Sequence, residues 1–81
     1  MEKLKVAGSE VKDFIQQFLG YAHVEECDIL RSDLRLDDAS IEMLVGACNQ
    51  QFNAEAQVEG LQTVKQLIKR VRKTVKAPGV A

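Results

Sequence analysis

Few residues in this 81-residue chain are able to perform chemistry. Its one histidine, His23, and its two cysteines, Cys27 and Cys48, do not form the closely spaced ligand set of a structural zinc site. No residues stand at a spacing typical of a nucleophile and its base, and no glycine-rich phosphate-binding loop is present. These patterns do not favour an enzyme or a metal protein.

The densest group of reactive side chains consists of two adjacent carboxylates and a hydroxyl, Asp37, Asp38 and Ser40, just before an apolar helical stretch. Adjacent carboxylates can shift each other's pKa by mutual repulsion. At the exposed start of a helix, however, aspartate and serine more often cap free backbone N–H groups, and aspartate complements the helix dipole. A structural and a functional role therefore both stay open for these residues.

The composition is that of one globular domain, with 46% hydrophobic and 28% charged residues. We interpret residues 1–81 as a single domain with a core at 9–76 and a flexible tail at 77–81. No apolar run approaches the ~20 residues that cross a bilayer, and no secretory signal is recognisable at the start. We therefore expect a cytoplasmic monomer without a membrane span.

Charge is divided unevenly along the chain. Residues 1–60 contain all twelve carboxylates and five basic residues, a formal charge of −7, whereas residues 61–81 contain six basic residues and no acid, a charge of +6. Such a division can mark an interaction surface. Nucleic acid is not the favoured partner, because the net charge is −1, aromatic residues are not interleaved with the basic ones, and cations near a helix C-terminus complement its dipole.

A first helix is predicted between Ser9 as its N-cap and Gly20 as a left-handed C-terminal residue. Its apolar stripe has the spacing i, i+3, i+4, i+7 and i+8. The stripe consists of Val11, Phe14, Ile15, Phe18 and Leu19. From residue 21 to 38 this period fades, and we expect a long loop held by buried apolar side chains. The apolar residues of this loop are Val24, Ile29, Leu30, Leu34 and Leu36.

A second helix is predicted with Asp38 or Ser40 as its cap and Asn53 at its end. Gly46 in its interior costs ~1 kcal/mol relative to alanine, which indicates close packing or a contact surface. A short third helix is expected within residues 54–59. The apolar stripe of the second helix consists of Ile41, Leu44, Val45, Cys48 and Phe52.

A last helix begins with a capping box in which Thr63 is the N-cap and Gln66 the N3 residue. Together the segments predict an all-α four-helix bundle with three main helices, a short third helix, a long first loop and an up-down layout. The predicted core contains Phe14, Phe18, Leu44, Phe52, Val64, Leu67, Ile68 and Val71.

The segment 30–39 and the helix that follows it carry a family resemblance. An apolar loop residue leads to Asp33-Leu34, and an acidic pair precedes an apolar helix that ends in Phe52. This order resembles the central motif of acyl and peptidyl carrier proteins, which is Asp-Leu-Gly, a short gap, Asp-Ser-Leu and an apolar helix ending in phenylalanine. Thr63 and Val64 are similar to the entry of the family's last helix, so the resemblance covers residues 11–75.

The resemblance implies a non-enzymatic carrier with 4'-phosphopantetheine joined to a serine oxygen through a phosphodiester. Alignment on Asp33 and Phe52 places Asp38 at the attachment position, and a carboxylate cannot accept this group. The nearest hydroxyl is that of Ser40, two residues later. Ser40 as a shifted attachment residue, a degenerate carrier fold without a prosthetic group, and a misleading alignment all stay open.

The function implied is the presentation of an acyl or aminoacyl group to enzymes of polyketide, peptide or fatty-acid biosynthesis. The implied partners are these synthases and a phosphopantetheinyl transferase. The partner surface is predicted at the start and the neutral face of the second helix, around Asp37, Asp38, Met43 and Gly46. The alternative is a degenerate carrier fold that acts as a protein-interaction subunit.

Overall fold

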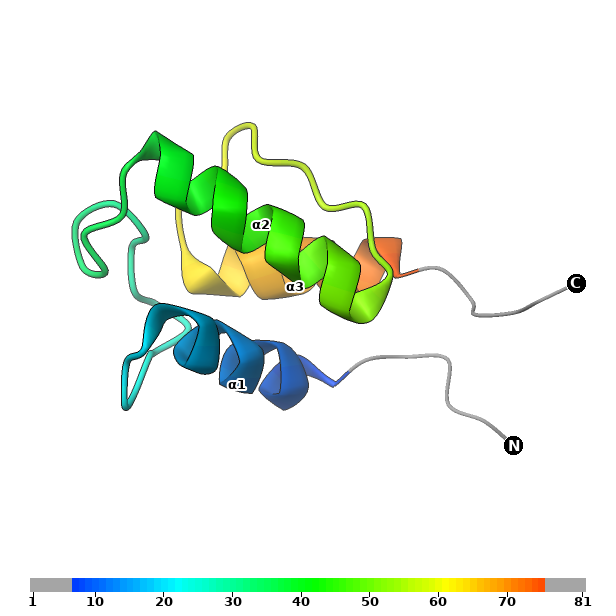
Figure 1. Cartoon of the computed structure of the whole chain (residues 1–81), viewed down its shortest axis with the longest axis horizontal. Coiled ribbons are helices and arrows are strands. Elements are labelled where there is room, and N and C mark those ends of the chain that lie inside the picture. The colour runs from blue at the N-terminus through cyan, green and yellow to red at the C-terminus, as the bar shows by residue number, and fades with distance from the viewer. Residues whose placement is uncertain (1–6, 76–81) are drawn as a thin grey trace, which may run out of the picture.

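Three helices form the part of the chain that the computed structural model describes, residues 7–75 (Figure 1). They are α1 (Gly8–Leu19), α2 (Asp38–Phe52) and α3 (Val64–Thr74). Within these residues the fold is all-α, and the β-type pairing is limited to an isolated antiparallel bridge between Ile29 and Thr63. The predicted tail at 77–81 lies outside the described residues.

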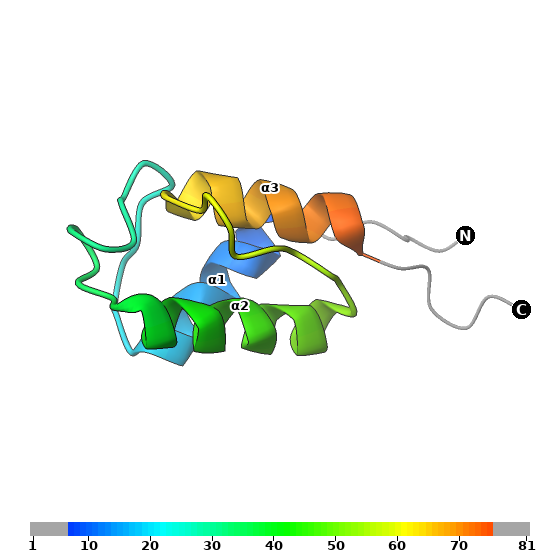
Figure 2. The same cartoon turned by 90° about the horizontal axis from the view of Figure 1, so that it is seen from above.

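The helices are joined by two long connections, residues 20–37 and 53–63. α1 runs antiparallel to α2 and α3, which both run in the same direction (Figure 1). The connection 20–37 crosses one end of the bundle, and the connection 53–63 returns along its length from the end of α2 to the start of α3 (Figure 2). Both connections therefore cover part of the bundle surface.

One core collects the apolar sides of the three helices and several residues of both connections. Five of the predicted core residues are buried, and these are Leu44, Val64, Leu67, Ile68 and Val71. Further fully buried side chains come from α1, from the first connection and from α2. They are Val11, Ile15, Val24, Leu30 and Cys48, each 0% exposed.

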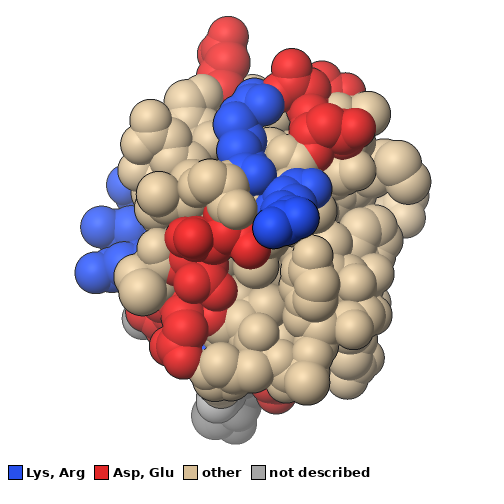
Figure 3. Space-filling model, turned by 90° about the vertical axis from the view of Figure 1, so that its left-hand side faces the viewer, with Lys and Arg blue, Asp and Glu red and all other residues tan. Residues whose placement is uncertain are grey.

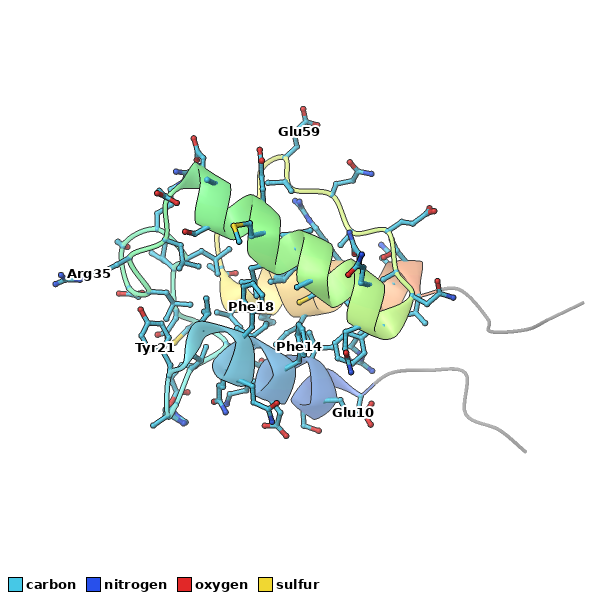
Figure 4. The ribbon with its side chains drawn as sticks, viewed as in Figure 1. Glu10, Phe14, Phe18, Tyr21, Arg35 and Glu59 are labelled. Atoms are coloured by element: carbon cyan, nitrogen blue, oxygen red, sulfur yellow. The ribbon has the colours of Figure 1, made fainter. Side chains whose placement is uncertain are left out.

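The three phenylalanines lie at the border of this core. Phe14 and Phe52 are partly buried and pack edge to face, with ring centroids 5.7 Å apart. Phe18 is 41% exposed, so its assignment to the core was wrong. Phe14 and Phe18 both point from α1 toward α2 (Figure 4). Because the connections cover other sides of the bundle, the outer edge of the α1–α2 contact stays open around Phe18.

The N-cap of α1 lies two residues earlier than predicted. Ala7 is the N-cap residue, and its N–H donates to the Glu10 carboxylate at 3.1 Å, so Ser9 lies inside the first turn. The prediction for the other end is confirmed, because Gly20 has φ of 76° and its N–H donates to the carbonyl of Gln16. A left-handed residue at this position closes a helix without the steric cost that a side chain would add.

The short helix predicted within residues 54–59 does not form. The amide of Asn49 in α2 instead accepts from the Ala56 N–H at 2.9 Å and donates to its carbonyl at 3.2 Å. Arg70 of α3 donates to the carbonyls of Gln57 and Glu59, at 2.9 and 2.7 Å. Side chains of α2 and α3 thus replace helical hydrogen bonds and hold this segment extended.

The first connection is held as predicted by buried apolar residues, including Val24, Leu30 and Leu34. Hydrogen bonds add to this packing, since the Tyr21 hydroxyl donates to the Leu34 carbonyl at 2.8 Å. Ile29 is the exception among the predicted residues, because it is 43% exposed. The long loop is therefore a fixed part of the fold between α1 and α2.

Candidate functional site

The first turn of α2 is capped by Asp37, not by Asp38 or Ser40 as predicted. The Asp37 carboxylate accepts from the Ser40 N–H at 2.8 Å. This bond, a second bond from the Ser40 hydroxyl and the charge of Arg31 together lower the pKa of Asp37 below its ordinary value of 3.8. Asp37, Asp38 and Ser40 were each capable of capping this helix, and the backbone turn selected the first of them.

Asp38 is the first residue of α2, and its carboxylate forms an ion pair with the guanidinium of Arg31. Both side chains are largely exposed, at 75% and 61% of their area. An exposed pair of this kind contributes little to stability, because water and salt screen it. It does fix the loop arginine beside the helix start, where α2 meets the second connection.

A groove of about 460 Å³ opens next to Asp38. It lies between the first turns of α2 and the second connection, and Arg31 borders it. A second depression of about 320 Å³ shares Arg31, Leu61 and Gln62 with it and continues toward the exposed Ile29. The floor of the groove includes the buried residues Ile41 and Leu61, and its rim is charged.

Ser40 lies on another side of the helix from this groove. It is half-buried, and two residues in an α-helix turn a side chain by about 200° relative to Asp38. The same edge of α2 includes Ala47 and Gln51, and Gln51 borders a depression of about 430 Å³ against Phe14 and other residues of α1. The hydroxyl of Ser40 and the groove beside Asp38 are therefore not brought together.

Met43 and Gly46 lie on the outer face of α2. Met43 is 65% exposed, and a Cβ added to Gly46 would meet no atom within 4 Å. Of the two explanations for Gly46, close packing is therefore wrong, and a contact surface stays a prediction. The side of the molecule formed by α1 and α2 shows a broad area without charged side chains, whereas acidic and basic groups share the loop end (Figure 3).

The histidine and cysteines do not converge on this site. His23 is exposed and pairs with Glu25, which lowers the pKa of Glu25. Cys48 is buried in the core, and desolvation raises the pKa of its thiol to about 12, whereas Cys27 is exposed in the first connection. Within residues 7–75, no three His, Cys, Asp or Glu side chains form a group that could hold a metal ion.

Two residues of this region were not identified from the sequence. Arg31 stands among acidic loop residues without a recognisable motif, and Asn49 lies among other polar residues of α2 without one. Their contacts with Asp38 and Ala56 link positions seven residues apart. Neither distance corresponds to a local turn or capping pattern, so the sequence carried no direct signal for either role.

None of the helices in residues 7–75 is both long and apolar enough to cross a bilayer. Comparison of the chain with known protein families, curated proteins and solved structures found no significant match. A function for this chain therefore has to be inferred from its own residues and geometry.

Proposed function

We propose that the protein is an acyl- or peptidyl-carrier-like domain that presents the start of α2 to biosynthetic enzymes. The observation that carries this proposal is the geometry of the loop that leads into α2. Leu30 and Leu34 are buried, and Arg35 has a left-handed backbone with φ of 59°. Arg35 follows Asp33-Leu34, where the resembled motif has the glycine of Asp-Leu-Gly, and glycine is the residue that adopts this conformation most readily.

The order of the segments supports the same proposal. α2 and α3 run in the same direction, and the segment 53–63 returns between them (Figure 2). In an up-down four-helix bundle the third helix follows this path, whereas here residues 53–63 follow it as a loop. We therefore propose, as the specific fold, a carrier-like four-helix arrangement in which a loop replaces the third helix.

Ser40 is the proposed attachment residue for 4'-phosphopantetheine. Its oxygen would form the new phosphodiester bond with coenzyme A as donor, and the nucleotide part of coenzyme A would leave. Ser40 is half-buried and lies in the first turn of α2, after the acidic residues Asp37 and Asp38. A transferase and carrier-dependent synthases are the proposed partners.

The test is incubation of the full chain with coenzyme A and a broad-specificity phosphopantetheinyl transferase, followed by intact-mass measurement. We expect the mass of one phosphopantetheine to be added slowly to the native protein and not to Ser40→Ala. Ser32→Ala is the matched control, because it removes an exposed serine from the preceding loop. Addition that survives Ser40→Ala would show that Ser40 is not the attachment residue.

A second candidate is an interaction domain without a prosthetic group. The observation that favours it is the arrangement of the two aspartates, since Asp37 already caps α2 and Asp38 pairs with Arg31 beside the groove. Under this proposal the native chain is not modified, and Asp38→Ser rapidly accepts phosphopantetheine at position 38. If the native chain and Asp38→Ser were both modified at Ser40 and at the same rate, the result would support the carrier instead.

The outer face of α2 is the proposed docking surface for the transferase and other partners. Gly46→Trp adds a bulky side chain where the structure leaves open space, so the domain is expected to fold normally. It should raise the KM of the transferase reaction on whichever variant is modified, and it should not lower the melting temperature, because it also removes a helix-interior glycine. An unchanged KM would place the docking surface elsewhere.

A further inference from the structure

The solvent-facing side of α3 is almost entirely basic. Val64, Leu67, Ile68 and Val71 point into the core, and the opposite side carries five cationic residues. In Figure 2, α3 forms an outer edge of the bundle, and Figure 3 shows basic side chains on that side of the molecule. We call this surface the α3 strip, and its residues are Lys65, Lys69, Arg70, Arg72 and Lys73.

The charge of the α3 strip is not balanced within its own segment. Residues 60–75 contain no acidic residue. Lys65, Lys69 and Lys73 are exposed, and within residues 7–75 none of these three lysines takes part in an ion pair. Three adjacent ammonium groups are therefore available to a partner.

The stability of α3 explains only part of this pattern. Arg72 and Lys73 lie in the last turn, where cations complement the helix dipole. Lys65, however, is the second residue of α3, at the positive end of that dipole. Lys65 and Lys69, and likewise Lys69 and Lys73, are like charges at the spacing i, i+4, which destabilises a helix. An arrangement that opposes local stability without a compensating contact marks a functional surface.

The α3 strip is short and has acidic residues at both ends. Eight residues of helix separate Lys65 from Lys73 by about 12 Å. At the first turn, the Lys65 N–H donates to the carbonyl of Glu26 at 2.8 Å. At the last turn, the Glu55 N–H donates to the hydroxyl of Thr74 at 3.1 Å. A long polyanion such as a nucleic acid would therefore pass from the strip onto acidic residues in either direction.

We propose that the α3 strip binds an acidic helical segment of another protein. Lysines at i, i+4 and i+8 are spaced about 6 Å apart along the helix axis. Carboxylates at the same spacing on a partner helix would face them one to one, which gives the contact both its charge complementarity and its register. This surface is separate from the start of α2, and the proposal holds whether or not the chain carries a prosthetic group.

The test uses the isotope-labelled full chain and an alanine-based helical peptide with three glutamates, one at every fourth position. We expect chemical-shift changes confined to α3 and binding that weakens as salt screens the charges. Combining Lys65→Gln, Lys69→Gln and Lys73→Gln should weaken binding by about tenfold or more. The matched control combines Lys12→Gln, Arg31→Gln and Arg35→Gln, which removes the same charge from other surfaces and should leave the affinity within about twofold.

Three results would overturn the proposal. They are no binding of the peptide at low salt, shift changes outside α3, and equal affinity of the α3 variant and the control. A short DNA duplex that binds through α3 more tightly than the peptide would assign the strip to nucleic acid instead. Thermal unfolding of each variant verifies that it is folded, and the α3 variant should be at least as stable as the native chain because repulsion is removed.

Discussion

Arg35 and Asn53 are the two residues other than glycine with a left-handed backbone in the described chain, with φ of 59° and 56°. Asn53 ends α2, where asparagine is a common left-handed cap. Arg35 has no such local reason, and its side chain points away from the bundle (Figure 4). Its conformation is imposed by the buried neighbour Leu34 and by the turn into α2, so the position carries backbone strain.

We expect Arg35→Gly to stabilise the fold by about 0.5–1 kcal/mol, because the relief of backbone strain outweighs the entropy that glycine adds to the unfolded chain. Asn53→Gly is the control and should change stability by less than about 0.5 kcal/mol. Urea-induced unfolding measures both. A loss of stability in Arg35→Gly would mean that the arginine side chain makes a stabilising contact.

Asp37 makes the stability of the fold depend on pH. Its folded-state pKa lies below the ordinary value of 3.8, because Ser40 and Arg31 favour the carboxylate form. A lowered folded pKa contributes stability that is present above 3.8 and is lost as the pH falls through the folded value. Asp37→Asn keeps a capping side chain and removes this charge.

We therefore expect the difference in melting temperature between native protein and Asp37→Asn to shrink as the pH falls from neutral into the range below 3.8. Asp37→Ala should be less stable than both at neutral pH, because it also loses the cap. Calorimetry at a series of pH values gives the comparison. A difference that does not change with pH would show that Asp37 is not preferentially charged in the fold.

At the scale of the helices, the two ends of α3 contribute oppositely to its stability. The capping box is confirmed, because the Gln66 N–H donates to Thr63 at 3.2 Å and the Thr63 N–H donates to Gln66 at 3.3 Å. Lys65 follows this cap within the first turn, whereas Lys73 lies in the last turn. The same substitution at the two positions therefore separates the effect of the dipole from that of net charge.

Lys65→Glu should stabilise the domain by about 0.5–1 kcal/mol, since it complements the dipole and pairs with Lys69. Lys73→Glu changes the net charge equally but opposes the dipole, so we expect no gain or a small loss. Chemical denaturation of both variants gives the difference. Equal effects would show that net charge, rather than position in α3, determines the outcome.

At the scale of the whole molecule, the sides of α1 differ in how far they are enclosed. Ile15 is fully buried in the core, whereas Phe18, one turn later, is 41% exposed. The larger side chain thus contributes less of its area to the core. A domain of this size has little stability in reserve, so the difference should be directly measurable.

Ile15→Ala should cost about 2–5 kcal/mol, because it removes buried methyl groups and leaves a cavity. Phe18→Ala should cost about 1–2 kcal/mol, in proportion to the area that is buried. Thermal and urea unfolding give both values. A greater cost for Phe18→Ala would mean that α1 is turned about its axis relative to the structure described.

The sequence by itself determined where the helices lie and how several of them end. Gly20, Asn53 and the pair Thr63–Gln66 were identified in advance because each acts on residues within about four positions. The apolar period likewise placed the buried sides of α2 and α3. The cap of α2 is a local feature too, but Asp37, Asp38 and Ser40 could each supply it, and only the loop conformation selected Asp37.

Only the tertiary structure decided the path of residues 53–63, the exposure of Phe18 and the position of the groove beside Asp38. The extended path depends on Arg70, which bonds to Gln57 thirteen positions away, and on Asn49, which bonds to Ala56 seven positions away. The exposure of Phe18 depends on which sides of the bundle the connections cover. Contacts between distant positions follow from how the helices pack, and no local spacing in the sequence encodes them.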